Sequence, residues 1–177
     1  MKEIGGAASG ERTEIVLAGI GGQGLVYLGK LLAEVAVEAD WHAVQTQSYG
    51  VASRGGFTKS EVILARAPIA SPIVERPNAV LALTEEAHTR YSGKLPEGAM
   101  IVYDTDAVDS EPAAGEVGLP FTTTARRLDL MGSYNVLALG AFTVIAQLLP
   151  TDAVRAQLSG QNAEAFDAGV SLALEGE

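Results

Sequence analysis

The chain has 177 residues, which is enough for one domain with a full core and too few for two. Its hydrophobic content of 47% is typical of a globular protein, and its formal net charge is −10, from 22 acidic and 12 basic residues. This charge argues against nucleic acid, which needs a basic surface, and against an anionic membrane. The absence of cysteine excludes disulfides and thiolate-bound iron–sulfur clusters on this chain.

No targeting or membrane-spanning segment is expected. Residues 1–12 are small and polar, without the apolar core of a signal peptide. We expect them to form a flexible N-terminal segment before a single domain over residues 13–177. The longest apolar stretch, about 136–149, is too short to cross a bilayer. The expected location is therefore the cytoplasm.

The first part of the chain predicts a strand, a helix and a second strand. Residues 13–18 form a short, β-branched apolar run that ends at Gly19, which is typical of a buried strand. Leucines at helical spacing predict a helix over about 22–39. Residues 42–47 predict the second strand. A strand–helix–strand unit of this kind implies parallel strands.

The rest of the chain continues the alternation. Further strands are predicted over residues 57–65, 79–83, 99–103 and, briefly, 121–123. Further helices are predicted over residues 85–92, 133–149, about 152–158 and about 162–174. Residues 104–120 are acidic and rich in glycine and proline, and we expect a surface excursion there. The expected fold class is α/β, a three-layer Rossmann-like domain with a mostly parallel sheet.

The most informative stretch is the glycine loop, Gly19-Ile20-Gly21-Gly22-Gln23-Gly24. Glycines at this spacing let backbone N–H groups approach a ligand, and the helix N-terminus behind them favours a phosphate. A nicotinamide cofactor would also need an acidic residue at the end of the second strand. That strand ends Gln45-Thr46-Gln47, and Asp40 lies at its other end. The glycines therefore serve a tight turn alone or a phosphate-bearing ligand other than NAD.

A second glycine-rich loop, from Tyr49 to Gly56, follows the second strand. Loops at the ends of parallel strands share one edge of a sheet, so we expect it beside the glycine loop. Arg54 lies among small residues within it. Its planar guanidinium suits a phosphate or a carboxylate, although a surface pair with a neighbouring acidic side chain is an equal alternative.

No arrangement of nucleophile, base and orienting group is visible, so no catalytic residue is assigned. His42 begins a strand and is expected to be half-buried, whereas His88 is expected on a solvated helix face with Glu85 and Glu86. These two histidines lie far apart in the sequence, which argues against zinc. Asp104 and Asp106 could bind a divalent ion, but such a pair more often ends a strand. No metal ligand is assigned.

Four motifs occur in order: the glycine loop, Gln45-Thr46-Gln47-Ser48-Tyr49-Gly50, Arg54-Gly55-Gly56 and Ser60-Glu61-Val62-Ile63. Together they resemble the gamma subunit of the 2-oxoacid:ferredoxin oxidoreductases over about residues 13–150. The resemblance continues through Asn135 with Leu139-Gly140. The second loop is most similar to the 2-oxoglutarate type, although Val51-Ala52 stands where a Pro-Glu pair is usual.

The resemblance implies oxidative decarboxylation of a 2-oxoacid, with coenzyme A accepting the acyl group and ferredoxin the electrons. The partners implied are alpha and beta subunits, with a delta subunit where present. Thiamine diphosphate, magnesium and iron–sulfur clusters are expected on those partners, because this chain has no cysteine and no Gly-Asp-Gly thiamine diphosphate signature. We hypothesise that the N–H groups of Gly21, Gly22, Gln23 and Gly24 hold the pyrophosphate of coenzyme A, with Arg54 adding a charge-assisted bond.

Two other functions stay open at this point. The glycine loop could belong to a stand-alone nucleotide-binding module, or the chain could be a scaffolding subunit without a ligand. The acidic charge also indicates that ferredoxin, itself typically acidic, docks on another chain.

Overall fold

The computed structural model describes residues 12–49 and 56–175 of the chain. Two expectations therefore lie outside the described residues: the N-terminal segment, apart from Arg12, and Arg54. Among the described residues, no helix combines the length and apolar character that a bilayer crossing would need.

The centre of the molecule is a six-stranded sheet of order β2-β3-β1-β4-β5-β6. The strands are β1 (Arg12–Ile20), β2 (His42–Tyr49), β3 (Phe57–Ala65), β4 (Ala79–Ala82), β5 (Met100–Asp104) and β6 (Glu116–Leu119). The β1, β4, β5 and β6 strands are parallel, whereas β3 is antiparallel to both of its neighbours, β1 and β2. The predicted, mostly parallel sheet is thus confirmed. The β1 and β2 strands run in the same direction, as expected, but they are not neighbours, because β3 lies between them.

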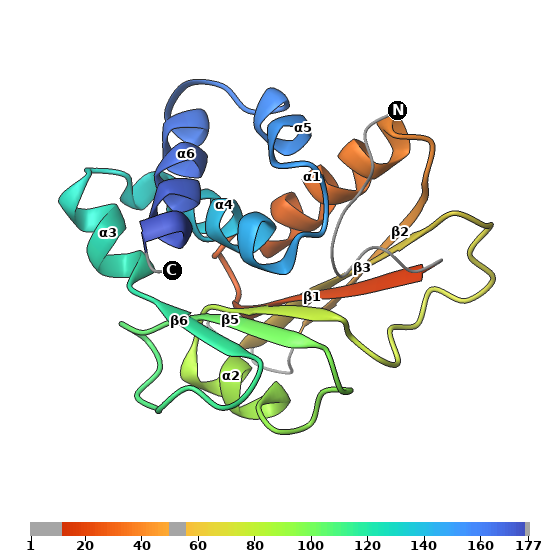
Figure 1. Cartoon of the computed structure of the whole chain (residues 1–177), viewed down its shortest axis with the longest axis horizontal. Helices are drawn as coiled ribbons and strands as arrows, with labels where there is room; N and C mark the ends of the chain where they lie inside the picture. The colour runs from red at the N-terminus through yellow and green to blue at the C-terminus, as the bar shows by residue number, and fades with distance from the viewer. Residues whose placement is uncertain (1–11, 50–55, 176–177) are drawn as a thin grey trace.

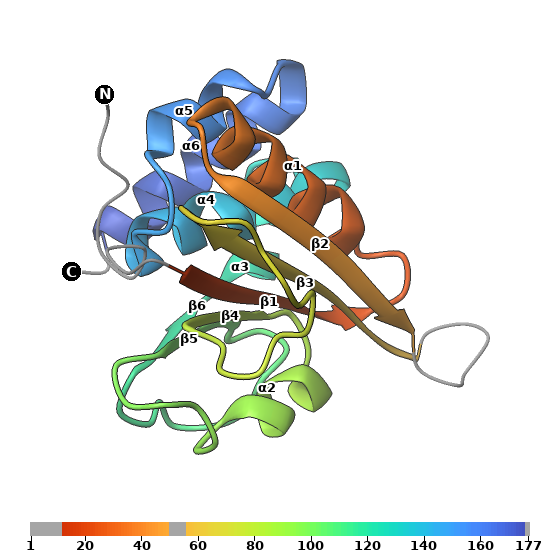
Figure 2. The same cartoon turned by 90° about the vertical axis from the view of Figure 1, so that its right-hand side faces the viewer.

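Helices cover both faces of the sheet, as Figures 1 and 2 show. The helices are α1 (Leu25–Glu38), α2 (Glu85–Tyr91), α3 (Phe121–Arg127), the short 3-10 helix η2 (Met131–Ser133), α4 (Tyr134–Ala146), α5 (Thr151–Ala156) and α6 (Gly160–Glu175). The α2 helix lies on one face, and α1, α4, α5 and α6 lie on the other. The three-layer α/β architecture predicted from the sequence is confirmed, with one layer much thicker than the other.

The two layers have separate cores because side chains of a strand alternate between the faces of a sheet. In β1, Ile15 and Leu17 belong to the large core beneath α1, α4 and α6. Val16 and Ala18 of the same strand belong to the smaller core beneath α2. Residues 13–19 of β1 are buried between the two layers, so the strand holds the glycine loop that follows in a fixed position.

Two predictions about residues 104–123 are wrong. The expected surface excursion contains β6, and the expected last strand is the start of α3. The reason is Asp104, which is fully buried at the end of β5 and accepts hydrogen bonds from the N–H of Phe121 at 3.0 Å and the hydroxyl of Thr122 at 2.7 Å. A carboxylate that receives the first donors of a helix fixes where that helix begins.

The two histidines also differ from expectation. His88 is buried, and its Nε2 lies 3.0 Å from Oε2 of Glu116, which joins α2 to β6. The predicted solvated face of α2 carries Glu85 and Glu86 but not His88. His42 is exposed, because it begins β2 at the edge of the sheet.

Candidate functional site

The glycine loop leaves the end of β1 and turns into α1. Gly22 and Gly24 have positive φ angles of 97° and 74°, which favour glycine over any residue with a side chain. The Gln23 side chain folds back over the loop. Its Oε1 accepts a hydrogen bond from the N–H of Ile20 at 2.8 Å, and its Nε2 lies 3.5 Å from the carbonyl of Leu83. Gln23 therefore closes the loop and is engaged by the protein.

Gly24 lets α1 approach the start of α4. A Cβ atom at Gly24 would collide with the side-chain amide nitrogen of Asn135. Gly24 is also the N-cap of α1, and no side chain caps this helix. The N–H groups of its first turn therefore lack a capping side chain, which is the arrangement that binds anions at helix N-termini.

Gly21 differs from its neighbours because the chain itself does not require a glycine there. Its φ angle is not positive, and a Cβ atom would meet only Oγ1 of Thr58, at an ordinary distance of 3.7 Å. The described residues therefore do not require a glycine at this position.

Backbone hydrogen bonds within the loop already use some of the N–H groups that were predicted to bind a phosphate. The N–H of Gly21 donates to the carbonyl of Gly56 at 3.3 Å, and the N–H of Gln23 donates to Ile20 at 3.3 Å. No such bond from Gly22 or Gly24 is present among the described residues. The bond to Gly56 also brings the end of the second loop against the glycine loop, as expected.

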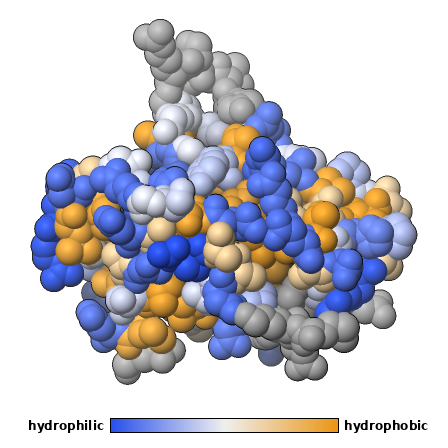
Figure 3. Space-filling view, turned by 90° about the horizontal axis from the view of Figure 1, so that it is seen from above, coloured by the Kyte–Doolittle hydropathy of each residue, from blue (hydrophilic) through white to orange (hydrophobic). Residues whose placement is uncertain are grey.

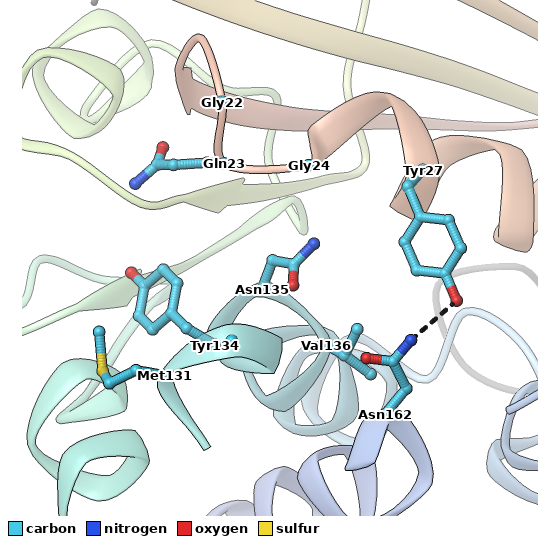
Figure 4. Close-up of a pocket in the computed structure, with 10 residues that line it drawn as sticks. Gly22, Gln23, Gly24, Tyr27, Met131, Tyr134, Asn135, Val136 and Asn162 are labelled. Carbon is cyan, nitrogen blue, oxygen red and sulfur yellow. Dashed lines mark hydrogen bonds between the residues drawn. The ribbon is translucent and has the colours of Figure 1, made fainter. Parts of the chain in front are cut away.

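A pocket of about 530 Å³ opens beside the glycine loop, between α1 and the start of α4 (Figure 4). This volume falls within the range of small-molecule sites. The described residues that line the pocket are Gly22, Gln23, Gly24, Tyr27, Met131, Gly132, Tyr134, Asn135, Val136 and Asn162. None of these residues is charged. The pocket therefore offers backbone N–H groups, amides and aromatic rings to a ligand.

The walls of the pocket are fixed by hydrogen bonds. Tyr134 donates its hydroxyl to Oδ2 of Asp104 at 2.8 Å. Burial and the nearby Asp104 carboxylate raise the pKa of Tyr134 well above its usual value, so this hydroxyl stays protonated. On the other wall, Asn162 accepts from the hydroxyl of Ser133 at 2.6 Å, and its amide nitrogen lies 3.5 Å from the hydroxyl of Tyr27.

The two aspartates at and just after the end of β5 accept hydrogen bonds from the first residues of α3. Asp104 receives the donors described above, and Asp106 accepts from the N–H of Thr123 at 2.6 Å and its hydroxyl at 2.8 Å. Within the described part of the chain, no cluster of three or more histidine, aspartate or glutamate side chains could hold a metal ion.

Comparison with known proteins decides the family. The family model described as pyruvate ferredoxin/flavodoxin oxidoreductase matches residues 14–174. The chain belongs to this family. The resemblance drawn from the four sequence motifs is thereby confirmed.

Relatives within the family include the 2-oxoglutarate synthase subunit KorC of Methanocaldococcus jannaschii. It is 34% identical, over 93% of this chain and 95% of the relative. The crystal structure of the gamma subunit of a keto/oxoacid ferredoxin oxidoreductase from Geobacter sulfurreducens is also 34% identical. It has a TM-score of 0.79 and covers 94% of this chain and 98% of that one.

A solved structure with lower sequence identity is 2-oxoglutarate:ferredoxin oxidoreductase from Magnetococcus marinus, determined with 2-oxoglutarate, coenzyme A and succinyl-CoA bound. It is 22% identical with a TM-score of 0.80, and the match covers 94% of this chain but 32% of that one. At this identity the likeness shows a shared fold.

Sequence reasoning found the glycine loop but missed the opposite wall of the pocket. Tyr27, Tyr134 and Asn162 carried no motif, because α4 and α6 reach the loop only through the folding of the chain. Asn135 was visible in the family resemblance but was not assigned a place in the site. Its proximity to Gly24, which the missing Cβ atom of that glycine permits, could not be predicted from the sequence.

Proposed function

We propose that this chain is the gamma-type subunit of a 2-oxoacid:ferredoxin oxidoreductase of the 2-oxoglutarate type. The assembled enzyme oxidatively decarboxylates the 2-oxoacid, forms the acyl-CoA and reduces ferredoxin. The observation that carries this proposal is the 34% identity to a 2-oxoglutarate synthase subunit across nearly the whole of both chains.

The residues of this chain support a division of labour among subunits. The chain has no cysteine, so it does not fit an iron–sulfur cluster. The described lining of its pocket contains no acid or base that could serve a reaction. Thiamine diphosphate, magnesium and the clusters therefore belong to the alpha, beta and, where present, delta subunits. Thiamine diphosphate supplies the decarboxylation chemistry when it is bound there, and this chain supplies binding.

The glycine loop fits the phosphate-bearing end of coenzyme A. Among the described residues, the N–H groups of Gly22 and Gly24 have no backbone partner, and no side chain caps the first turn of α1. Gly21 leaves room for a ligand to approach, while the N–H groups of Gly21 and Gln23 hold the loop itself in place. On the sequence alone we expect Arg54, which lies outside the described residues, to add a positive charge to this site.

The surface supports assembly with partners. Seen from the side of the thicker helical layer, apolar patches lie between hydrophilic ones (Figure 3). Large apolar side chains of the helical elements are exposed, among them Val37, Leu128, Met131 and Leu174. Exposed apolar side chains of this size suit a subunit interface.

The proposal is tested in the assembled enzyme by Arg54→Ala. The variant should raise the KM for coenzyme A and leave kcat at saturating coenzyme A little changed, because Arg54 binds the ligand and not the reacting atoms. An unchanged KM for coenzyme A in a normally assembled complex would show that Arg54 does not bind this ligand. A complex that lacks this chain and still forms acyl-CoA at the full rate would refute the subunit assignment.

A further inference from the structure

The two edges of the sheet differ in how well they are protected. The β6 edge has four residues and is followed at once by Pro120, which has no N–H group to offer a new strand. The β2 edge has eight residues, and within the described chain β2 pairs with β3 alone. Figure 2 shows β2 on the side of the molecule that faces the viewer, next to α1. The sheet therefore has one short edge and one long, open edge.

The β2 strand lacks the features that keep an open edge from pairing. Natural proteins protect long edges with proline, with lysine or with a bulge that twists the strand away. Neither residue occurs in β2, and its pairing with β3 runs without interruption from His42 opposite Ala65 to Tyr49 opposite Thr58. Every second residue of an antiparallel edge strand directs its N–H and carbonyl groups away from the sheet. These groups form a template on which another strand can pair.

A hollow beside this edge adds an apolar surface to it. The hollow has a volume of about 590 Å³ and lies between α1 and β2, with Ala33, Val37 and Ala43 among its described lining residues. Val37 is 56% exposed, although apolar side chains of this size are usually buried. Contact with another protein surface would remove these side chains from water, which favours association.

Charged side chains of α1 indicate which surface that is. Lys30 lines one end of the hollow, with Glu34 one turn further along α1 and Glu38 at the other end. Nζ of Lys30 lies 3.5 Å from Oε1 of Glu34, and Glu38 is held by a hydrogen bond from Gln157 at 2.6 Å. A surface that is basic at one end and acidic at the other is complementary to a second copy of itself that runs in the opposite direction.

We propose that the β2 edge binds a second copy of this chain. The two β2 strands pair antiparallel about a two-fold axis perpendicular to the sheet, and the two six-stranded sheets become continuous. Both copies of α1 then lie on the same face and run in opposite directions, so that Lys30 of each copy faces Glu34 and Glu38 of the other. This inference goes beyond the proposed function, because it concerns the number of copies in the assembly and not the reaction.

Reversal of charges tests whether the bound partner is another copy. Lys30→Glu should weaken self-association of the full-length chain about tenfold in sedimentation equilibrium, because two-fold symmetry repeats the lost contact. Adding Glu34→Lys and Glu38→Lys reverses the whole surface and makes it complementary to itself again, so most of the association should return. The same triple variant would be mismatched against any different partner.

Arg126→Glu is the matched control. It makes the same change in charge on α3, which follows the strand at the opposite edge of the sheet. It should leave self-association unchanged. The Tm of each variant verifies that the chain remains folded, as expected for substitutions of exposed side chains.

A cross-link locates the contact in the assembled enzyme. The chain has no cysteine, so Val44→Cys places a single thiol in the middle of β2. A short bis-maleimide should join two copies of the chain through this thiol, and mass spectrometry of the product identifies both cross-linked peptides. Glu164→Cys, on the exposed side of α6, should give no such product.

The outcomes distinguish the occupants that the edge could have. Self-association that Lys30→Glu leaves unchanged, or that the triple variant fails to restore, overturns the pairing of two copies. A cross-link from Val44→Cys to a different subunit overturns it too, and shows that this subunit covers the edge. The absence of any product that joins two copies has the same consequence. None of these readouts uses enzyme activity, so the result leaves the proposed function unaffected.

Discussion

At the scale of single residues, the glycines of the loop have different roles, and this difference can be measured. Gly24→Ala should lower the free energy of unfolding by about 1–3 kcal/mol, since the substitution combines a positive φ angle with a collision against Asn135. Gly21→Ala should change it by about 0.5 kcal/mol or less, because its Cβ atom finds ordinary space. Urea unfolding of the two variants checks both values. Equal destabilisation by the two substitutions would contradict this assignment of roles.

Gly21→Ala also separates ligand binding from folding. If the bare backbone at Gly21 serves the approach of coenzyme A, the variant should raise the KM for coenzyme A several-fold in an assembled enzyme of normal stability. A KM equal to that of the unmodified enzyme would show that the ligand does not approach this side of the loop.

Asp104 is the residue that connects the fold to the pocket wall. Asp104→Asn should cost about 2–4 kcal/mol, because an amide cannot accept from Phe121, Thr122 and Tyr134 together and leaves buried donors unsatisfied. Asp106→Asn, at an exposed cap of the same helix, should lower the free energy of unfolding by no more than about 1 kcal/mol. Thermal and urea unfolding measure the pair. A smaller loss for Asp104→Asn than for Asp106→Asn would contradict this role.

At the scale of elements, α4 and α6 pack closely through two glycines. A Cβ atom at Gly140 would collide with the carbonyl of Phe166, and one at Gly169 with the carbonyl of Leu137. Each substitution to alanine should lower the free energy of unfolding by about 1–3 kcal/mol, because backbone atoms cannot move aside as a flexible side chain can. The double variant should be destabilised by less than the sum of the two single effects, because one shift of the helices relieves both collisions. Glu164→Ala on the exposed side of α6 is the control.

The elements show how far the sequence could predict this fold. The α1 helix, with its apolar period, and β1 and α4, with their continuous apolar runs, were predicted to within a few residues of their ends. The start of α3 was mistaken for a strand because it depends on Asp104, a distant cap that no local pattern reveals. The antiparallel β3 follows from a connection, residues 50–56, that is too short for a parallel crossover.

At the scale of the whole molecule, two buried carboxylates couple stability to pH. Burial alone would raise the pKa of Glu14, but the N–H groups of Arg76 and Glu75 and the side chain of Arg12 more than offset it, so the pKa lies below its usual 4.5. Burial would also raise the pKa of Glu116, but hydrogen bonds from Ser92 and His88 outweigh burial, so this pKa is lowered as well. Carboxylates with lowered pKa values stabilise the protein above the unfolded pKa and lose that contribution as pH falls through the folded pKa.

The free energy of unfolding should therefore decrease as pH falls from about 5 to about 3. Glu14→Gln should flatten part of this decrease and lower the stability at neutral pH, since the amide forms weaker bonds with the loop that carries Glu75 and Arg76. Urea unfolding at several pH values measures both effects, with the exposed Glu164→Gln as control. A pH profile that Glu14→Gln leaves unchanged would contradict the role of this carboxylate.

The central claim is that this chain works as the gamma-type subunit of a 2-oxoacid:ferredoxin oxidoreductase. The most direct measurement is purification of a tagged copy of the chain from its native host, followed by assay of the product against a panel of 2-oxoacids. The account predicts a brown complex that contains thiamine diphosphate- and cluster-binding subunits and oxidises 2-oxoglutarate in a coenzyme A-dependent reaction. A stable monomer without these subunits and without 2-oxoacid activity would contradict it.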